Sequence, residues 1–283
     1  MKNMMPAAFL FLIVFWNAEN LFDDRPGFNA KCNGIAKTLM MMADECGEMP
    51  DAIALAEVKD RATMSKLVYR TPLRKFDYGI VHYDSPDKRG IDCALLYRKS
   101  SFRLLGSKPC HICDSSGATL RTRDILLVEM LSSVGNDTLA ILVNHHPSKL
   151  GDGSSARRAI AMDRMNSLCD SLEKRGIRNI LCVGDFNDDV WPGRQPESLS
   201  GKATGTIKYN GHWEKIDGCF ARGLTVRETI YDAPHLLTDD SRFGGMKPFR
   251  AFSGPRYTGG ISDHLPIILS VSSQSHSSEG CEK

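Results

Sequence analysis

The chain has 283 residues, of which 42% are hydrophobic and 25% are charged. This composition is typical of a soluble globular protein with enough apolar material for a sizeable core. The 36 basic and 34 acidic side chains leave a formal net charge of +2. Such a balance excludes a strongly basic protein that coats nucleic acid, although it allows a local basic cleft.

The first apolar run, Pro6 to Trp16 (PAAFLFLIVFW), has two interpretations. After Lys2 it resembles a signal peptide, but no small-residue cleavage site follows within the run. It is also too short for a membrane span, so we expect no transmembrane anchor. We favour a first strand over Phe9 to Trp16, buried on both faces, in a cytoplasmic protein. Export stays open because of this apolar N-terminus.

Strand-like apolar runs recur along the chain, with helical patterns between them. The predicted strands are Phe11–Trp16, Ala52–Glu57, Tyr78–Tyr83, Cys93–Arg98, Ile125–Leu131, Leu139–His146, Asn179–Val183, Lys215–Ala221 and Leu265–Val271. The predicted helices are Asn29–Glu45, Arg61–Tyr69 and Ser154–Lys174. The turn-rich sequence DSPDKRG predicts an antiparallel hairpin between the third and fourth strands.

The pattern predicts an α/β fold in which two sheets pack face to face with helices outside. We expect a single domain over residues 1–272, because no internal repeat or linker interrupts it. Residues 273–283 are polar and poor in apolar side chains, which is typical of a disordered tail.

The nine cysteines form an odd and scattered set without a disulfide framework, which indicates a reducing compartment. One pair, Cys110 and Cys113, follows Pro109 in a stretch that we expect to be a loop. A zinc site would need a second ligand pair, and the sequence offers no convincing one. We favour incidental thiols, and a redox motif remains the alternative.

Chemically active side chains collect at the ends of the predicted strands. In VGDFND, for example, Asp185 and Asn187 fall two residues apart after a strand. In extended backbone they would point to the same side, although the same residues also favour a simple turn. The other strand-end residues are Asn17, Glu19, Glu57, Asn144, His145, His146, Asp217, Asp263 and His264.

This mixture of side chains predicts a particular chemistry. Carboxylate and amide oxygens without a cysteine cluster suit a hard divalent cation, Mg²⁺ or Mn²⁺. A histidine beside carboxylates supplies an acid or base near neutral pH. Together they are the groups needed for the attack of water on a phosphate ester.

The motifs WNAENLFD, LAEVKD, NHHPS, GDFND, KIDG and SDHLP, in this order, resemble those of the endonuclease/exonuclease/phosphatase superfamily. WNAENLFD is similar to that of a bacterial subgroup. The resemblance runs from Asn17 to Pro266. It implies a four-layered α/β sandwich, with two mainly antiparallel sheets flanked by helices.

The resemblance also implies roles for individual residues. Glu57, Asn17 and Asp263 match metal-binding positions. His264 matches the catalytic histidine. Asp217 matches the aspartate that orients that histidine, and Asp185 and Asn187 match the pair that positions the attacking water. Asn144 and His146 match an N-x-H motif of the family, which implies that His145 faces the other way.

The match is incomplete where nucleases of this superfamily often carry a tyrosine, since this chain has Arg89-Gly-Ile-Asp92 instead. The sequence also shows no lysine-rich or aromatic-interleaved stripe that would grip nucleic acid. A phosphate substrate needs local positive charge, which we assign to Lys59, Arg89 and Arg123. The alternative, that these three are solvated surface cations, stays open.

The sequence therefore predicts a divalent-metal-dependent phosphoester hydrolase, most plausibly a monomeric phosphodiesterase that acts on nucleic acid. The first alternative is an enzyme whose substrate is a small phosphorylated molecule, an inositol phosphate or a lipid head group. The second alternative is a non-catalytic binding module, which is less favoured because every expected catalytic position is filled.

Overall fold

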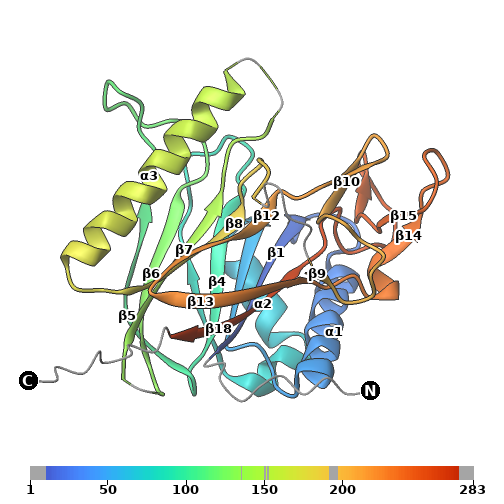
Figure 1. Ribbon diagram of the computed structural model, residues 1–283. Helices are drawn as coiled ribbons and strands as arrows, with labels where there is room; N and C mark the ends of the chain where they lie inside the picture. Colours follow the sequence, from blue (N-terminus) through green and yellow to red (C-terminus); the bar gives the residue numbers. More distant parts are fainter. Residues whose placement is uncertain (1–10, 135, 150, 152, 191–196, 274–283) are drawn as a thin grey trace, which may run out of the picture.

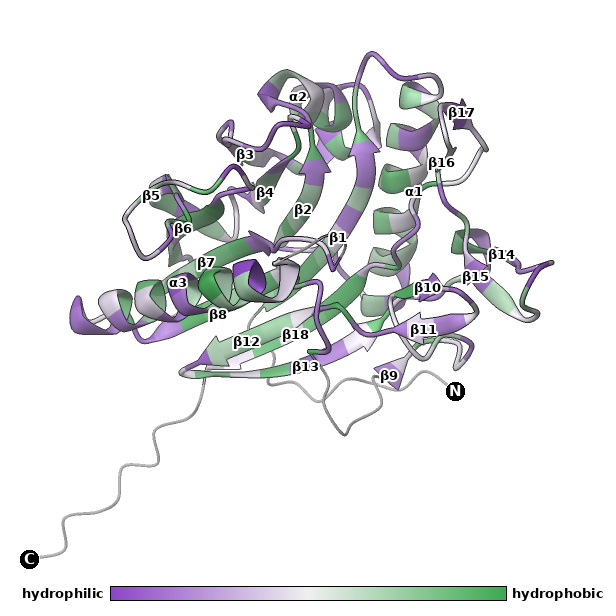
Figure 2. Ribbon diagram, turned by 90° about the horizontal axis from the view of Figure 1, so that it is seen from above, coloured by the Kyte–Doolittle hydropathy of each residue, from purple (hydrophilic) through white to green (hydrophobic). Residues whose placement is uncertain are grey.

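The structure is a computed structural model that describes residues 11–134, 136–149, 151, 153–190 and 197–273. Two large sheets pack face to face, and helices cover their outer faces (Figures 1 and 2). The predicted α/β class with mainly antiparallel sheets is confirmed.

The larger sheet has seven strands, in the order β3-β4-β2-β1-β18-β13-β9. The pairs β1–β2 and β13–β9 are parallel, and the other neighbours are antiparallel. The bounds are β1 Phe11–Leu21, β2 Ala52–Val58, β3 Tyr78–His82, β4 Asp92–Arg98, β9 Glu197–Ser198, β13 Leu224–Ile230 and β18 Ile267–Ser273.

The smaller sheet has five strands, in the order β12-β8-β7-β6-β5, and only its pair β7–β8 is parallel. The bounds are β5 Phe102–Cys110, β6 Ile125–Ser132, β7 Thr138–His145, β8 Asn179–Asp185 and β12 Asp217–Arg222. Short two-stranded hairpins are β10 Ile207–Tyr209 with β11 His212–Glu214, β14 Leu237–Asp239 with β15 Met246–Pro248, and β16 Phe252–Ser253 with β17 Arg256–Tyr257.

Three α-helices form the outer layers. Helix α3 (Ser154–Lys174) packs through Met165, Leu168 and Leu172 on the outer face of the five-stranded sheet. Helices α1 (Phe28–Cys46) and α2 (Arg61–Tyr69) pack on the seven-stranded sheet. Two short 3₁₀ helices, η1 (Pro72–Phe76) and η2 (Pro234–Leu236), complete the elements. Figure 2 shows α3 on one side of the strands and α1 and α2 on the other.

The central core lies between the two sheets, where side chains of β1, β2 and β18 meet those of β6, β7 and β8. Because β1 is parallel to β2, and β7 to β8, the carboxyl ends of these four strands lie at one edge of their sheets. The antiparallel strands β12 and β18 begin at that same edge. The topology therefore gathers the polar strand ends, which the sequence scatters over the chain.

The structure confirms the nine predicted strands and three predicted helices to within a few residues. Strand β1 is the central strand of the larger sheet, as expected for the described part of the apolar run. Residues 1–10 and 274–283 lie outside the described residues, and with them the question of a signal and nearly all of the expected tail. Ser273, the first residue of that tail, is the last residue of β18.

One local prediction was wrong. Pro109 and Cys110 belong to strand β5 rather than to a loop, and they pair with Leu126 and Ile125. Proline is tolerated there because β5 is the edge strand, where a missing N–H leaves no neighbour unsatisfied. Cys110 is buried and Cys113 is exposed, both as free thiols.

The close approach of β7 and β8 gives a first prediction, at Gly184. A Cβ on this residue would lie 2.2 Å from the backbone oxygen of Asn144. Gly184→Ala should therefore lower the free energy of unfolding by about 1–3 kcal/mol, measured by urea denaturation. Gly106→Ala is the control, because no atom lies within 4 Å of a Cβ there. Equal stability of the two variants would contradict the packing described here.

Candidate active site

Polar side chains meet at the mouth between the two sheets. The backbone register of the five-stranded sheet places His145, Asp185 and Asp217 side by side on β7, β8 and β12. The seven-stranded sheet brings Asn17 from β1 and His264 from the segment just before β18. Residues predicted at separate strand ends are thus direct neighbours.

Asp185 lies at the centre of this mouth and joins the two sheets. One of its oxygens accepts a hydrogen bond from the Asn17 amide at 3.1 Å, and the other accepts one from the backbone N–H of Asn187 at 3.0 Å. Burial, reinforced by the negative charge of Asp217, raises the pKa of Asp185 to about 7. Asp185 is therefore a carboxyl group that can bind or release a proton near neutral pH.

His264 is held by Asp217, as the sequence predicted. Its Nδ1 lies 2.8 Å from an Asp217 oxygen, and its Nε2 lies 3.9 Å from Asp185. Burial alone would lower the pKa of His264, but the carboxylates of Asp217 and Asp185 raise it well above its usual value. Thr206 donates a second hydrogen bond to the same Asp217 oxygen, and Trp16 donates one to the backbone oxygen of His264 at 2.8 Å. The ring is thus fixed with Nε2 toward the mouth.

Asn187 reaches the site by a turn and not by strand alternation. Its backbone is left-handed (φ 51°), a conformation that asparagine adopts more readily than most residues. Its N–H closes the turn on Asp185, and its side-chain amide donates to the backbone oxygen of His146 at 3.0 Å. For Asp185 and Asn187 the sequence left open either a simple turn or a place in the active site, and in the structure these residues form a turn at the site.

Glu57 is presented by an irregularity in the pairing of β1 and β2. The parallel register shifts after Asn17, and Glu19, Asn20 and Glu57 all have positive φ, at 44°, 53° and 60°. Such conformations cost about 1–3 kcal/mol each and concentrate at functional sites. One Glu57 oxygen accepts a hydrogen bond from the N–H of Asn20 at 2.9 Å. The irregularity turns the carboxylate of Glu57 out of the regular strand.

A buried lysine from α1 lies close to these acidic groups. Lys31 donates a hydrogen bond to the backbone oxygen of Glu19, and its ammonium lies 5.1 Å from the centre of the Phe252 ring. Burial lowers the pKa of Lys31 to about 8, and the carboxylates of Glu19, Glu57 and Asp263 limit that fall. Lys31 therefore supplies a resident positive charge next to the predicted metal ligands.

Asp263 lies at the exposed side of the cluster that Glu19 and Glu57 form with Lys31. Arg250 reaches both Asp263, at 3.4 Å, and Glu19, at 3.5 Å. The carboxylate of Glu19 also accepts hydrogen bonds from the backbone N–H groups of Ala251 and Phe252. Glu19 therefore anchors the segment that carries Arg250.

The directions predicted for the side chains of His145 and His146 were wrong. His145, expected to face away, has its Nε2 3.5 Å from the Asp185 carboxylate. His146 instead packs edge-on against Phe186, with ring centres 5.1 Å apart, and burial lowers its pKa to about 3. Asn144 is fully buried and donates to the backbone oxygens of Leu142 and Val183. The pleat of β7 sends His145 into the mouth and Asn144 toward α3, because alternate residues of β7 face the two cores.

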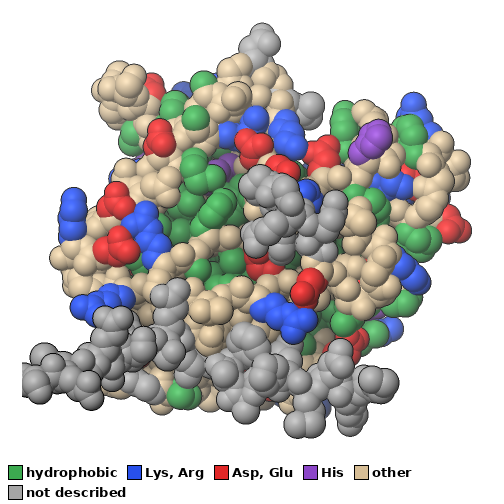
Figure 3. All heavy atoms as spheres, viewed as in Figure 1, with side chains coloured by type: hydrophobic (Ala, Val, Ile, Leu, Met, Phe, Trp, Pro, Cys, Tyr) green, Lys and Arg blue, Asp and Glu red, His purple; other side chains and the backbone are tan. Residues whose placement is uncertain are grey.

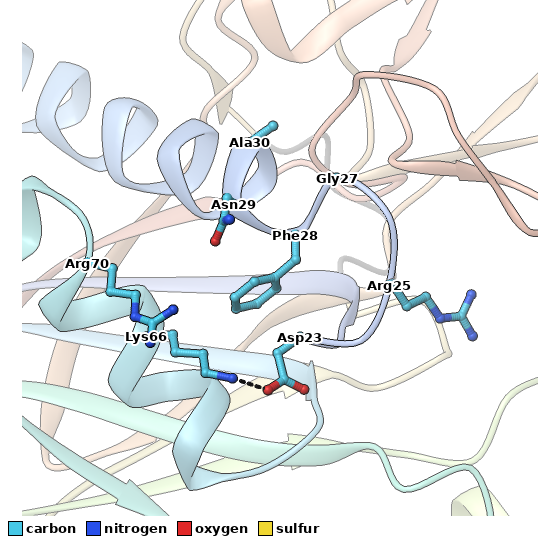
Figure 4. A pocket seen from close by; sticks show the side chains of 8 residues that line it. All are labelled: Asp23, Arg25, Gly27, Phe28, Asn29, Ala30, Lys66 and Arg70. Atoms are coloured by element: carbon cyan, nitrogen blue, oxygen red, sulfur yellow. Dashed lines mark hydrogen bonds and ion pairs between the residues drawn. The ribbon is translucent and has the colours of Figure 1, made fainter.

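The three predicted phosphate-binding cations have partners of their own. Lys59 lies 2.9 Å from Asp23 and 3.3 Å from Asp24. Figure 4 shows Asp23 paired with Lys66 at the wall of a cavity of about 380 Å³. Arg25 and Arg70 also line this cavity. Lys59 is thus part of an ion-pair group beside the site, which reduces its free positive charge.

Arg123 is buried, and it positions the histidine segment. It donates hydrogen bonds to the backbone oxygens of His145, at 3.1 Å, and of His146, and it lies 3.3 Å from Asp87. Its role in the structure is to hold that segment rather than to present a free charge. Arg89, also beside Asp87 at 3.4 Å, has a side chain that is 56% exposed and remains open to a substrate.

Sequence reasoning missed Lys31, Arg250, Thr206 and Trp16 as members of the site. Lys31 falls within a predicted helix, where a lysine is normally solvated, and Arg250 falls in a segment without periodicity. Only the tertiary packing brings them to the strand ends, so no local signal was available. Glu19 was noticed as a strand-end residue but received no role.

Comparison with known proteins places this geometry in a family. A family model described as "Endonuclease/Exonuclease/phosphatase family" matches residues 24–203. Among solved structures, the human Nocturnin catalytic domain with bound sulfate has a TM-score of 0.60 at 16% identity, with 93% of this chain and 94% of that chain covered. D. rerio TDP2 complexed with a single-strand DNA product has a TM-score of 0.56 at 18% identity, with 93% and 99% covered.

A curated relative, the ATP-dependent DNA helicase Hel308 of Methanocaldococcus jannaschii, is 25% identical over 178 residues. The match covers 60% of this chain and spans 12% of the length of that protein. The family model covers more than half of the chain, and the chain belongs to the endonuclease/exonuclease/phosphatase family. The members of this family are enzymes that hydrolyse phosphoester bonds and depend on divalent metals.

The residues at the mouth fit a hard divalent cation. Asp185, Asp217 and His264 bring ligand atoms within 4.8 Å of one another. Glu57 and Asp263 supply further carboxylates, both close enough to Lys31 to raise its pKa. Oxygen donors of this kind suit Mg²⁺ or Mn²⁺ better than softer metals. Burial raises the pKa of Asp185 most, and the negative charge of Asp217 adds to that rise; a bound cation would favour the charged carboxylate. None of the described helices is long and apolar enough to cross a membrane.

The burial of His146 gives a second prediction, on the pH dependence of stability. The unfolded chain protonates this histidine near pH 6.5, whereas the folded chain keeps it neutral down to about pH 3. Between these values the unfolded state binds more protons, so the His146 contribution to stability falls as pH is lowered. His146→Phe should therefore reduce the loss of unfolding free energy between about pH 7.5 and 5 by about 2 kcal/mol.

Urea denaturation at the two pH values checks this difference. The control is His212→Phe, which removes an exposed histidine of β11 and no buried ring. A wild-type protein and a His146→Phe variant with the same pH dependence would show that His146 is not buried as a neutral ring.

Proposed function

We propose that the chain is a Mg²⁺- or Mn²⁺-dependent phosphodiesterase in which the His264–Asp217 pair activates water for attack on phosphorus. The observation that carries this proposal is the 2.8 Å contact between His264 Nδ1 and Asp217, with Nε2 directed toward Asp185. A carboxylate on one ring nitrogen fixes the tautomer and makes the other nitrogen a stronger base. Asp217 and Asp185 raise the pKa of His264, so the ring must first release its own proton before Nε2 can take one from water.

In this mechanism each group at the mouth has one task. Asp185 accepts a hydrogen bond from the attacking water, and His264 takes the proton through Nε2. Asn187 closes the turn that fixes the Asp185 carboxylate. The water oxygen then bonds to phosphorus, and the bond from phosphorus to the leaving oxygen breaks.

His145, rather than His146, is proposed to contact the phosphoryl group, because it lies beside Asp185 in the mouth. Arg123 would act indirectly by fixing the backbone of this histidine. Arg89 is the predicted cation that stays available to a phosphate.

Glu57, Asn17 and Asp263 are proposed to hold the metal. When bound, the ion would neutralise charge that develops on the phosphoryl oxygens. Asn17 would also keep Asp185 in place, since its amide nitrogen donates to that carboxylate while its oxygen accepts the N–H of Glu19 at 3.0 Å. Lys31 would limit the mutual repulsion of the acidic ligands.

Nucleic acid is the proposed substrate, supported by the family assignment and by the similar structure of D. rerio TDP2 in complex with a single-strand DNA product. A small phosphorylated molecule or a lipid head group is the alternative substrate. A monomeric state and a cytoplasmic location remain predictions from the sequence.

A third prediction tests the catalytic pair. His264→Ala should keep the melting temperature but lose roughly 10²–10⁴ in kcat, the usual contribution of general acid–base catalysis. Asp217→Asn should lose much of the same factor, and the double variant should lose little more, because the two residues act as one unit. Rates are measured with Mg²⁺ on plasmid DNA, inositol phosphates and a chromogenic phosphodiester.

His111→Ala serves as the histidine control, since its side chain is 55% exposed and lies outside the mouth and the β10–β11 hairpin. A folded His264→Ala protein with near wild-type turnover on every substrate would refute the mechanism. If the wild-type protein hydrolyses inositol phosphates and neither plasmid DNA nor the chromogenic diester, the catalytic pair stands and the substrate is the small phosphorylated molecule rather than nucleic acid.

A further inference from the structure

Two short hairpins from distant parts of the chain form a lobe beside the active site. The hairpin β10–β11 and the hairpin β14–β15 project together in Figure 1. The tip of the first hairpin, Asn210-Gly211, packs under Phe243, since a Cβ on Gly211 would lie 3.0 Å from the Cβ of Phe243. Lys208 links the hairpins by donating to the backbone oxygen of Gly244 at 2.7 Å. The lobe is therefore one packed unit.

A hollow of about 280 Å³ runs between the hairpins and reaches the active site. It is lined by Tyr209, Arg242, Phe243, Lys247, Arg250 and Asp263, among others. Asp263 is a proposed metal ligand, and Arg250 contacts it at 3.4 Å. The hollow and the catalytic mouth therefore share a wall.

The outer part of this hollow carries exposed rings next to cations. Tyr209 is 57% exposed and Phe243 is 46% exposed. The guanidinium of Arg242 lies 4.9 Å from the centre of the Phe243 ring. Figure 3 shows hydrophobic and basic side chains gathered over the right-hand part of this face, where the lobe projects. Exposed apolar side chains that gather in one patch rimmed by polar groups are a feature of interaction sites.

The lobe is also in register with the catalytic histidine. Ile207 of β10 pairs with His264 in an antiparallel bridge, and Leu265 donates to the backbone oxygen of Thr206 at 2.7 Å. Tyr209 is two residues beyond Ile207 on the same strand, which places it roughly 7 Å further along. The first exposed ring thus stands a short distance along β10 from the backbone of His264.

We propose that this two-hairpin surface binds a single-stranded nucleic acid next to the phosphodiester being cleaved. The inference rests on the proposed function and names the substrate form for the same site. Unpaired bases stack on Tyr209 and on Phe243 with Arg242, because aromatic and guanidinium planes accept any base. Lys247 and Arg250 lie along the hollow, where the backbone phosphates pass toward the mouth.

The observations favour a nucleic acid over a lipid surface. Docking on a membrane needs several apolar side chains that enter the acyl region together. Here the Phe243 ring lies beside Arg242, and the hollow that Tyr209 and Phe243 share is also lined by Asp240 and Asp263. Acidic side chains oppose any anionic ligand to a similar degree, so the choice rests on the rings, because separate rings suit separate bases.

No aromatic-interleaved stripe is visible in the sequence, and the fold explains why. The rings and cations come from two hairpins that are far apart in the chain, and neither hairpin alone shows the pattern. The proposed surface therefore arises only from the packing of the two hairpins.

The test measures binding and cleavage separately. The probe is a short fluorescein-labelled oligothymidylate, titrated with the full chain in EDTA so that no turnover occurs. Tyr209→Ala and Phe243→Ala should each weaken its binding by about 5- to 150-fold, the usual effect of removing one stacking ring. Tyr69→Ala is the matched control, because Tyr69 is 58% exposed and lies at the end of α2, away from the lobe.

Cleavage with Mg²⁺ is then compared between the oligothymidylate and bis(p-nitrophenyl) phosphate. The ratio of kcat/KM for the oligonucleotide to that for the small diester should fall in the two lobe variants and not in Tyr69→Ala. Melting temperatures confirm that the variants are folded.

Unchanged oligonucleotide binding in both lobe variants would overturn the proposal. The proposal would also be overturned if the wild-type protein bound phosphatidylserine vesicles and not the oligonucleotide, and if the two lobe variants lost this vesicle binding. If the wild-type protein binds the oligonucleotide through the two rings but hydrolyses neither diester, the binding surface stands and the proposed function fails.

Discussion

The carboxylate of Asp185 is buried between the two sheets, and its hydrogen bonds constrain the whole mouth. A buried carboxylate is costly unless its oxygens are paired, and here the partners come from different parts of the fold. Asn17 donates from the larger sheet, and Asn187 donates from the turn after β8. His145 and His264 stand on either side, at 3.5 and 3.9 Å. Any change in the packing of the sheets would separate these groups, so fold stability and site geometry are coupled.

A second consequence is an excess of negative charge at one edge of the fold. Glu19, Glu57 and Asp263 share a region with the buried Lys31 and the half-exposed Arg250. Two fixed cations do not balance these carboxylates together with Asp185 and Asp217. The positive-φ backbone around Glu57 stores strain to keep this arrangement. A divalent cation is the natural complement of such a site, and the family assignment agrees with it.

The sequence predicted the elements whose signal is local. Apolar runs such as those of β1 and β8 are buried on both faces, so their residues alone indicate a strand. Strands β5 and β13 were missed because they alternate buried with exposed residues and lie at or near sheet edges. The pair His264–Asp217 was predicted from motif resemblance and lies as expected. The places of His145 and Lys31 in the site were not predicted, because the first depends on the pleat of β7 and the second on how α1 packs. Tertiary packing alone creates the two-hairpin surface.

The central claim is that the acidic mouth binds a divalent cation through Glu57. The most direct measurement is the melting temperature as a function of Mg²⁺ concentration, for the wild-type protein and for Glu57→Gln, with the exposed Glu48→Gln as control. A bound ion stabilises the folded state by about 2.7 kcal/mol at a hundred times its dissociation constant. The account predicts a saturable rise for the wild type and for Glu48→Gln, and a much weaker rise for Glu57→Gln. The same rise in all three proteins, or none in the wild type, would contradict it.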